Sequence, residues 1–203
     1  MTFQFLRRSV GPVSMIAAAL MIISQGVHLG LGLTQGAQSA DSAIHTVKYL
    51  LALVAMYALL LALTGLYLRQ ATAAGRLGLV GYLVAFMGTL LVAGDWWFES
   101  FVAPRIADLA PQVMDGAVTG SMAVGAAMTF GLFALGWTVF GIATFRANVY
   151  PRAAASLLGI GGVIGILALS TPYQVPLAAA IGWIGYSLNR VDRADSYEST
   201  ISV

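Results

Sequence analysis

The sequence predicts an all-helical integral membrane protein: one bundle of six transmembrane helices with both termini on the cytoplasmic side. Three features predict it. The 203 residues are 59% hydrophobic and only 9% charged, whereas a soluble protein carries about 25% charged residues. The mean hydropathy is +0.86. Long apolar runs recur along the chain, and most basic residues fall in every second connection between them.

The apolar runs give the individual spans. A bilayer core about 30 Å thick needs roughly 20 apolar residues per helix. The predicted spans are residues 10–33, 44–68, 77–98, 117–145, 153–170 and 172–188. Pro172 and Pro176 would interrupt a single helix of 36 residues over the last two runs, which favours two spans over one kinked helix. The connections are short, so residues 1–203 form one membrane domain.

The first run has an alternative interpretation as a signal peptide, because Arg7 and Arg8 precede it and a small-residue stretch at residues 37–40 follows it. The apolar part of a signal peptide is about 7–15 residues long. The run of 24 residues from Val10 to Leu33 exceeds this length. We therefore expect it to be retained as the first helix.

The basic residues predict the orientation of the bundle. With the N-terminus inside, eight of the ten Lys and Arg residues are cytoplasmic. These eight are Arg7, Arg8, Arg69, Arg76, Arg146, Arg152, Arg190 and Arg193. Only Lys48 and Arg105 are external. Because cytoplasmic loops are enriched in Lys and Arg, the sequence predicts a multi-pass protein of the cytoplasmic membrane, N-in and C-in.

The longest predicted connections are polar. Residues 100–116 form an outer loop, in which Pro104 could open a short helix. Such a helix would either cap the bundle or lie on the membrane surface. Residues 190–203 form a polar cytoplasmic tail that we expect to be frayed.

Glycine is abundant, with 23 residues. Small residues four positions apart allow the backbones of membrane helices to approach closely. Such pairs are Gly26 with Gly30, Gly116 with Gly120, Gly161 with Gly165, and Ala178 with Gly182. We expect these faces to pack within the bundle. The alternative is a face for a homo-oligomer or for a larger membrane complex.

Ionisable residues inside a membrane span are costly and point to a function by default. The chain places its few such residues toward the predicted outer leaflet. They are His28, His45, Lys48, Asp95 and Glu99, and together with the neutral Gln25 they are named the polar cluster below. Their spacings of three or four residues put each pair on one helix face.

Four interpretations of the polar cluster stay open. In the first, the side chains pair across helices near the water boundary and fix the helix order, with Trp96 and Trp97 in an interfacial aromatic belt. In the second, they bind a divalent metal. The metal ligands would be His28, His45, Asp95 and Glu99. The third is a proton- or ion-handling site, and the fourth is a haem or quinone pocket with the two histidines.

Several classes of function are excluded or disfavoured. The absence of cysteine rules out disulfides and thiolate metal sites. A net charge of +2 is too small for a nucleic-acid-binding protein. Nucleophile-elbow, HExxH and nucleotide-binding motifs do not occur. We expect a non-enzymatic accessory, structural or partner-binding membrane protein that requires no cofactor. The alternative is a small transporter or channel for protons or a small solute, and the third choice is a metal- or haem-dependent membrane enzyme.

Overall fold

The computed structural model describes the backbone of residues 2–30, 36–165 and 174–201, and the side chains of these ranges between residues 9 and 192. Every regular element in the described residues is a helix, so the prediction of an all-helical chain is confirmed. The helices are α1 (Thr2–Gly30), α2 (Ala37–Ala40), α3 (Ala43–Phe101), α4 (Ala103–Leu109), α5 (Pro111–Met114), α6 (Gly120–Ala147), α7 (Arg152–Ile164) and α8 (Val175–Ile201).

Three of these helices are long and apolar enough to cross a membrane. They comprise residues Ser9–Gly30 of α1, all of α3, and all of α6. Helix α7 is apolar but shorter, with 13 residues. Large apolar side chains such as Leu61, Leu83 and Met128 are exposed on the outside of the helices. Exposed apolar surface of this extent is typical of helices that face lipid, so the chain has the helices of a membrane protein.

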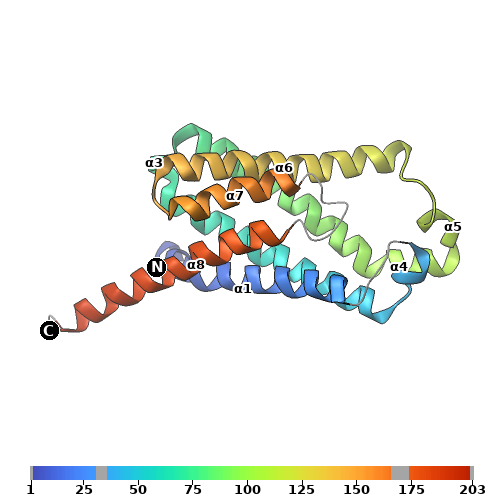
Figure 1. Cartoon of the computed structure of the whole chain (residues 1–203), viewed down its shortest axis with the longest axis horizontal. Helices are drawn as coiled ribbons and strands as arrows, with labels where there is room; N and C mark the ends of the chain where they lie inside the picture. Colours follow the sequence, from blue (N-terminus) through green and yellow to red (C-terminus); the bar gives the residue numbers. More distant parts are fainter. Residues whose placement is uncertain (1, 31–35, 166–173, 202–203) are drawn as a thin grey trace.

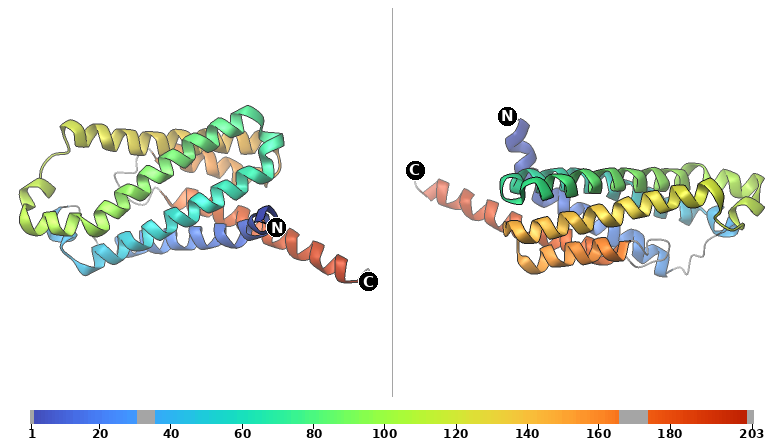
Figure 2. Two further views of the ribbon diagram at one scale, coloured as in Figure 1. Left: turned by 180° about the vertical axis from the view of Figure 1, so that it is seen from behind. Right: turned by 90° about the horizontal axis from the view of Figure 1, so that it is seen from above.

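Helix α3 is a helical hairpin rather than one rod. It spans 59 residues, but Gly75 has φ 57° and ψ −149°, a region that only glycine readily adopts. The chain reverses there, and its two arms run back side by side (Figures 1 and 2). The rings of Tyr67 and Tyr82 stack with centroids 4.5 Å apart. Thr64 Oγ1 lies 3.4 Å from Tyr82 Oη, which also joins the two arms.

The second arm of α3 packs directly on the backbone of α6. A Cβ atom on Gly81 would lie 2.7 Å from the backbone N of Phe140. Gly88 meets Phe133 in the same way, and Gly136 of α6 meets Ala85. Because these positions carry no side chain, the two helices approach closely. Trp137 is completely buried in this contact, and its Nε1 donates to Thr89 Oγ1 at 3.0 Å.

The remaining long helices pack alongside this pair. Helix α1 lies against the first arm of α3 and against α8, where Gly185 meets the backbone of Gly11 (Figure 1). Helix α7 lies against α6 through Gly141 and Gly159. Gly161 of α7 meets Leu177 of α8. Glycine faces at these positions therefore pack within the chain.

The helix bounds differ from the predictions near both ends of the chain. Helix α1 begins at Thr2 rather than near residue 10. The predicted polar tail is helical to Ile201, because residues 177–201 contain neither proline nor a run of helix-breaking residues. The predicted boundary between the last two spans, at Thr171 and Pro172, lies outside the described residues.

The connection at residues 100–116, predicted to be an outer loop, contains two short helices. Helix α4 begins with Pro104 in its first turn, and it ends because Ala110 has φ −149° and ψ 61°. Helix α5 follows at once. In this segment Leu109 and Val113 are exposed, while Ala103 and Ala107 are buried. Asp115 Oδ1 accepts a hydrogen bond from Ala37 N at 2.9 Å, which ties this connection to α2.

Candidate functional site

The predicted polar cluster lies at the end of the molecule opposite the Gly75 turn, because His45 is near the beginning of α3 and Glu99 is near its end. Ser42 fixes the start of the helix. Its Oγ accepts a hydrogen bond from His45 N at 3.2 Å and donates to Ser39 O at 2.7 Å. This is the arrangement of an N-cap. It places His45 in the first turn and Lys48 one turn later.

His45 joins the two arms of the hairpin. Its Nε2 lies 3.1 Å from Glu99 Oε2, and the two side chains are 9% and 24% exposed. The contact is an ion pair when the imidazole is protonated and a hydrogen bond when the neutral ring carries its proton on Nε2. In both states it closes the hairpin at the end away from its turn.

Lys48 joins α3 to α1. Its Nζ lies 2.8 Å from His28 Nδ1. An ammonium group has only donors, so the histidine nitrogen is the acceptor and the neutral ring carries its proton on Nε2. The same Nζ lies 4.0 Å from the centroid of the Tyr49 ring, a cation–π contact. With 6% exposure, Lys48 is a buried cation with partners on two sides.

Two further contacts connect α1 to its neighbours near Lys48. Ser24 Oγ donates to the backbone O of Lys48 at 3.2 Å. Gln25 Nε2 donates to Gln174 Oε1 at 3.3 Å, which joins α1 to the residue that precedes α8. Gln25 therefore pairs with Gln174 and not with His28, although sequence spacing puts Gln25 and His28 on one helix face.

Aromatic rings line the hairpin beside these contacts. The ring centroids of His45 and Tyr49 are 4.4 Å apart, and those of Tyr49 and Trp96 are 5.2 Å apart. Trp96 is buried, with 7% exposure, and only Trp97 is exposed. Of the two tryptophans predicted to lie in an interfacial aromatic belt, only Trp97 has the exposed side chain that this position requires. Consecutive helical residues point about 100° apart, so the two indoles face different surroundings.

Three polar groups in this region lack partners among the described residues. Trp96 Nε1 and Gln25 Oε1 are buried without a hydrogen bond. Asp95, which is partly exposed, makes no hydrogen bond or ion pair with any described residue. It lies one helical turn before Glu99, whose carboxylate acts electrostatically on both Asp95 and Lys48.

The predicted metal ligands divide into separate contacts. His28 pairs with Lys48, a cation, and His45 pairs with Glu99. No group of three or more His, Asp or Glu side chains that could hold a metal ion occurs in the part of the chain that the structure describes. The two histidines, one on α1 and one on α3, likewise have different partners, Lys48 and Glu99.

Sequence reasoning missed three participants: Ser24, Tyr49 and Gln174. Tyr49 could have been found, because it follows Lys48 directly and an aromatic ring beside a buried lysine is a common partner. Gln174 carried no such signal. Its pairing with Gln25 joins residues 149 positions apart, and only the packing of α8 on α1 brings them together.

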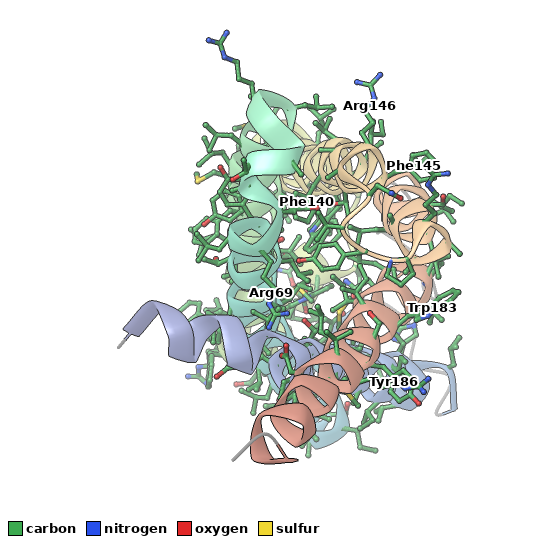
Figure 3. All side chains as sticks on the ribbon, turned by 90° about the vertical axis from the view of Figure 1, so that its left-hand side faces the viewer. Arg69, Phe140, Phe145, Arg146, Trp183 and Tyr186 are labelled. Atoms are coloured by element: carbon green, nitrogen blue, oxygen red, sulfur yellow. The ribbon has the colours of Figure 1, made fainter. Side chains whose placement is uncertain are left out.

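The opposite end of the molecule carries five of the seven Lys and Arg side chains that the structure describes. Arg69 lies between helices and forms an ion pair with Asp192 of α8, with 2.9 Å from Nη2 to Oδ2. Arg146 instead extends outward from the end of α6, next to Phe145 (Figure 3). We call this end, which contains Arg69, Arg76, Arg146, Arg152 and Arg190, the basic end.

No family model, no curated protein and no solved structure matches this chain. The residues and contacts described above are therefore the basis for its function.

Proposed function

We propose that the chain crosses a cytoplasmic membrane six times, with the basic end and both termini in the cytoplasm. The six proposed crossings are α1, the two arms of α3, α6, the span predicted from the sequence at residues 153–170, which includes α7, and α8. The hairpin and the short α6–α7 turn give alternating directions (Figures 1 and 2). Support comes from charge: five of the six arginines whose side chains the structure describes lie at one end, as the positive-inside rule requires of a cytoplasmic face.

Cysteine labelling tests this topology directly, because the chain has no cysteine of its own. Ala73 lies beside the Gly75 turn at the basic end, and Val118 lies at the other end; both are exposed. In sealed right-side-out vesicles, we expect a membrane-impermeant maleimide to label Val118→Cys. We expect it to label Ala73→Cys only after permeabilisation. Labelling of both or of neither before permeabilisation, or the opposite pattern, would contradict the proposed topology.

Within this membrane the chain acts as a non-enzymatic structural or accessory subunit. One observation carries this proposal: the side chains of the polar cluster are used in pairs that tie helices together. His45 with Glu99 closes the hairpin, Lys48 with His28 joins α3 to α1, and Gln25 with Gln174 joins α1 to the start of α8. Polar contacts of this kind fix helix order in a bilayer.

The experiment is a flux measurement on purified protein in proteoliposomes, with a pH-sensitive dye inside and a potassium gradient to drive proton entry. We expect wild type and Asp95→Asn to match empty liposomes. In blue-native electrophoresis of its own membranes, the tagged chain should migrate with a larger complex. Proton flux in the wild type that Asp95→Asn abolishes would overturn the accessory role.

That outcome would support the second candidate, a small transporter or channel for protons or a small solute. A specific observation favours it: Asp95, Gln25 Oε1 and Trp96 Nε1 lack partners among the described residues, close to a buried lysine. Unpaired polar groups inside a span often mark an ion or proton path. This candidate and the accessory role therefore differ in what Asp95 does.

A further inference from the structure

An apolar groove of about 550 Å³ runs between α6 and α7 on the outside of the bundle. Small residues form its floor, because Gly141 and Gly159 let the two helices touch. Its walls include Ile142 and Phe145 of α6 and Ile160 of α7, all exposed. Ligand sites are commonly about 300–1,000 Å³ in volume, so the groove is large enough for a ligand.

The groove has the length of one membrane leaflet. On α6 it extends from Thr138 to Arg146, which is about 12 Å at the helical rise of 1.5 Å per residue. On α7 it extends from Ala155 to Ile164, about 14 Å on the same basis. Half of the hydrocarbon core of a bilayer is about 15 Å. The groove therefore spans one leaflet, beginning at the basic end.

The end of the groove at the basic end of the molecule is positively charged. Arg146 lines the groove at the basic end, is exposed, and makes no ion pair or hydrogen bond with the described residues. Arg152 lies beside it: its guanidinium is 5.9 Å from the Phe145 ring, and its Nε donates to Asn148 Oδ1 at 3.0 Å. The mouth is therefore cationic, with no acidic side chain among its lining residues.

We propose that this groove binds an anionic phospholipid of the leaflet at the basic end, with one acyl chain along the groove and the phosphate on Arg146. An apolar wall that ends in a free guanidinium complements a molecule with an apolar tail and an anionic head. Basic pockets between membrane helices on the cytoplasmic side bind such headgroups. The site depends on the chain lying in a bilayer and is independent of the role of the polar cluster.

The test is thermal unfolding of the purified protein in a neutral detergent with added phosphatidylglycerol, phosphatidylcholine of the same acyl chains, or inorganic phosphate. We expect phosphatidylglycerol to raise the melting temperature more than the other two. Arg146→Gln should weaken the apparent affinity for phosphatidylglycerol about five- to tenfold, which corresponds to the loss of roughly one surface arginine contact.

Two further variants make the result specific. Arg76→Gln removes an exposed arginine from the same end but outside the groove, and it should leave the lipid response unchanged. Ser156→Phe fills the groove at an exposed position, and it should reduce the response although Arg146 is intact. Native mass spectrometry should detect retained phosphatidylglycerol on the wild type and on Arg76→Gln only.

Each of the following results would overturn the proposal. Equal stabilisation by both lipids would show that the headgroup is not recognised. Equal loss in Arg76→Gln and Arg146→Gln would reduce the effect to the overall charge of the basic end. An unchanged lipid response in Ser156→Phe would show that the acyl chain does not occupy the groove. Stabilisation by inorganic phosphate alone would show the same. A change in oligomeric state with Ser156→Phe would instead assign the groove to a second copy.

Discussion

At the scale of single residues, the notable feature is a lysine and two histidines that are placed inside apolar helices and nevertheless have partners. Lys48 has 6% exposure, and its Nζ contacts both His28 and the Tyr49 ring. A charge without partners in this position would be expensive. The pairs at this end therefore hold helices together. They also offset the free-energy cost of burying the polar groups that form them.

The His45–Glu99 pair gives a prediction at this scale. Glu99→Ala removes the acceptor of His45 Nε2 and should lower the free energy of unfolding by about 0.5–2 kcal/mol, the range of polar contacts between membrane helices. Equilibrium unfolding in mixed detergent micelles measures this loss. The matched control is Asp95→Ala, one turn away and without a hydrogen-bond partner among the described residues, which should change stability by less than about 0.5 kcal/mol. Equal losses in both variants would contradict the pairing.

At the scale of elements, the α3 hairpin is partly predictable. The sequence predicts spans at 44–68 and 77–98 with a tight turn between them, and the chain does reverse within that interval, at Gly75. It does not predict that the turn remains helical up to Gly75. The residues from Arg69 to Ala74 are good helix formers except for Thr72, and they include no proline, so the helix continues until the glycine.

Gly75 is therefore a position where a side chain is strained. Gly75→Ala forces a non-glycine residue to φ 57° and ψ −149°, at a cost of about 1–3 kcal/mol. We expect a lower melting temperature in detergent. The control is Gly94→Ala, in a helical position where an added Cβ meets no atom within 4 Å, and which should be neutral or slightly stabilising. A stable Gly75→Ala variant would contradict this turn geometry.

The α3–α6 contact gives a second prediction for an element. A Cβ on Gly88 would collide with the backbone of Phe133, which cannot move without separating the helices. Gly88→Ala should therefore destabilise the protein by about 1–3 kcal/mol, as overpacking does. Gly131→Ala on the facing helix meets nothing within 4 Å and should be tolerated. Unfolding curves of the two variants, measured side by side, test whether this approach of the backbones exists.

The candidate site is less predictable than the fold. Spacing along the chain places the six residues of the polar cluster near one end, because apolar runs determine depth. It cannot determine partners, since these depend on the rotation of each helix about its axis. Thus Gln25 pairs with Gln174 rather than His28, and Trp96 turns inward while Trp97 turns outward. The partner of each side chain therefore depends on how the helices pack against one another.

At the scale of the whole molecule, the connections differ in how much the bundle depends on them. The segment from Gly116 to Thr119 is exposed throughout and separates the short helices α4 and α5 from α6. The α6–α7 turn is tight instead. Asn148 adopts a left-handed conformation with φ 54°, and Tyr150 is buried, with its Oη donating to the backbone O of Leu66 at 3.0 Å.

This difference predicts the result of two insertions. A flexible Gly-Ser linker of about eight residues between Gly116 and Ala117 should be tolerated, because exposed loops absorb extra length at small entropic cost. The same linker between Asn148 and Val149 should abolish a monodisperse protein, because it displaces Tyr150 from its site. Size-exclusion chromatography in detergent, with melting temperature as a second readout, compares them. Equal behaviour of the two insertions would contradict the unequal roles of these connections.

The hairpin at Gly75 has a consequence for how the chain enters a membrane during synthesis. Its two arms are adjacent in sequence, and arginines at positions 69 and 76 flank the turn. The two arms can therefore insert into a membrane together, and the two arginines favour retention of the turn on one side of it. The contact of His45 with Glu99 spans 54 residues and lies wholly within α3, so it needs no residue that follows the hairpin. The hairpin can therefore form on its own, and it then presents the glycines on which α6 packs.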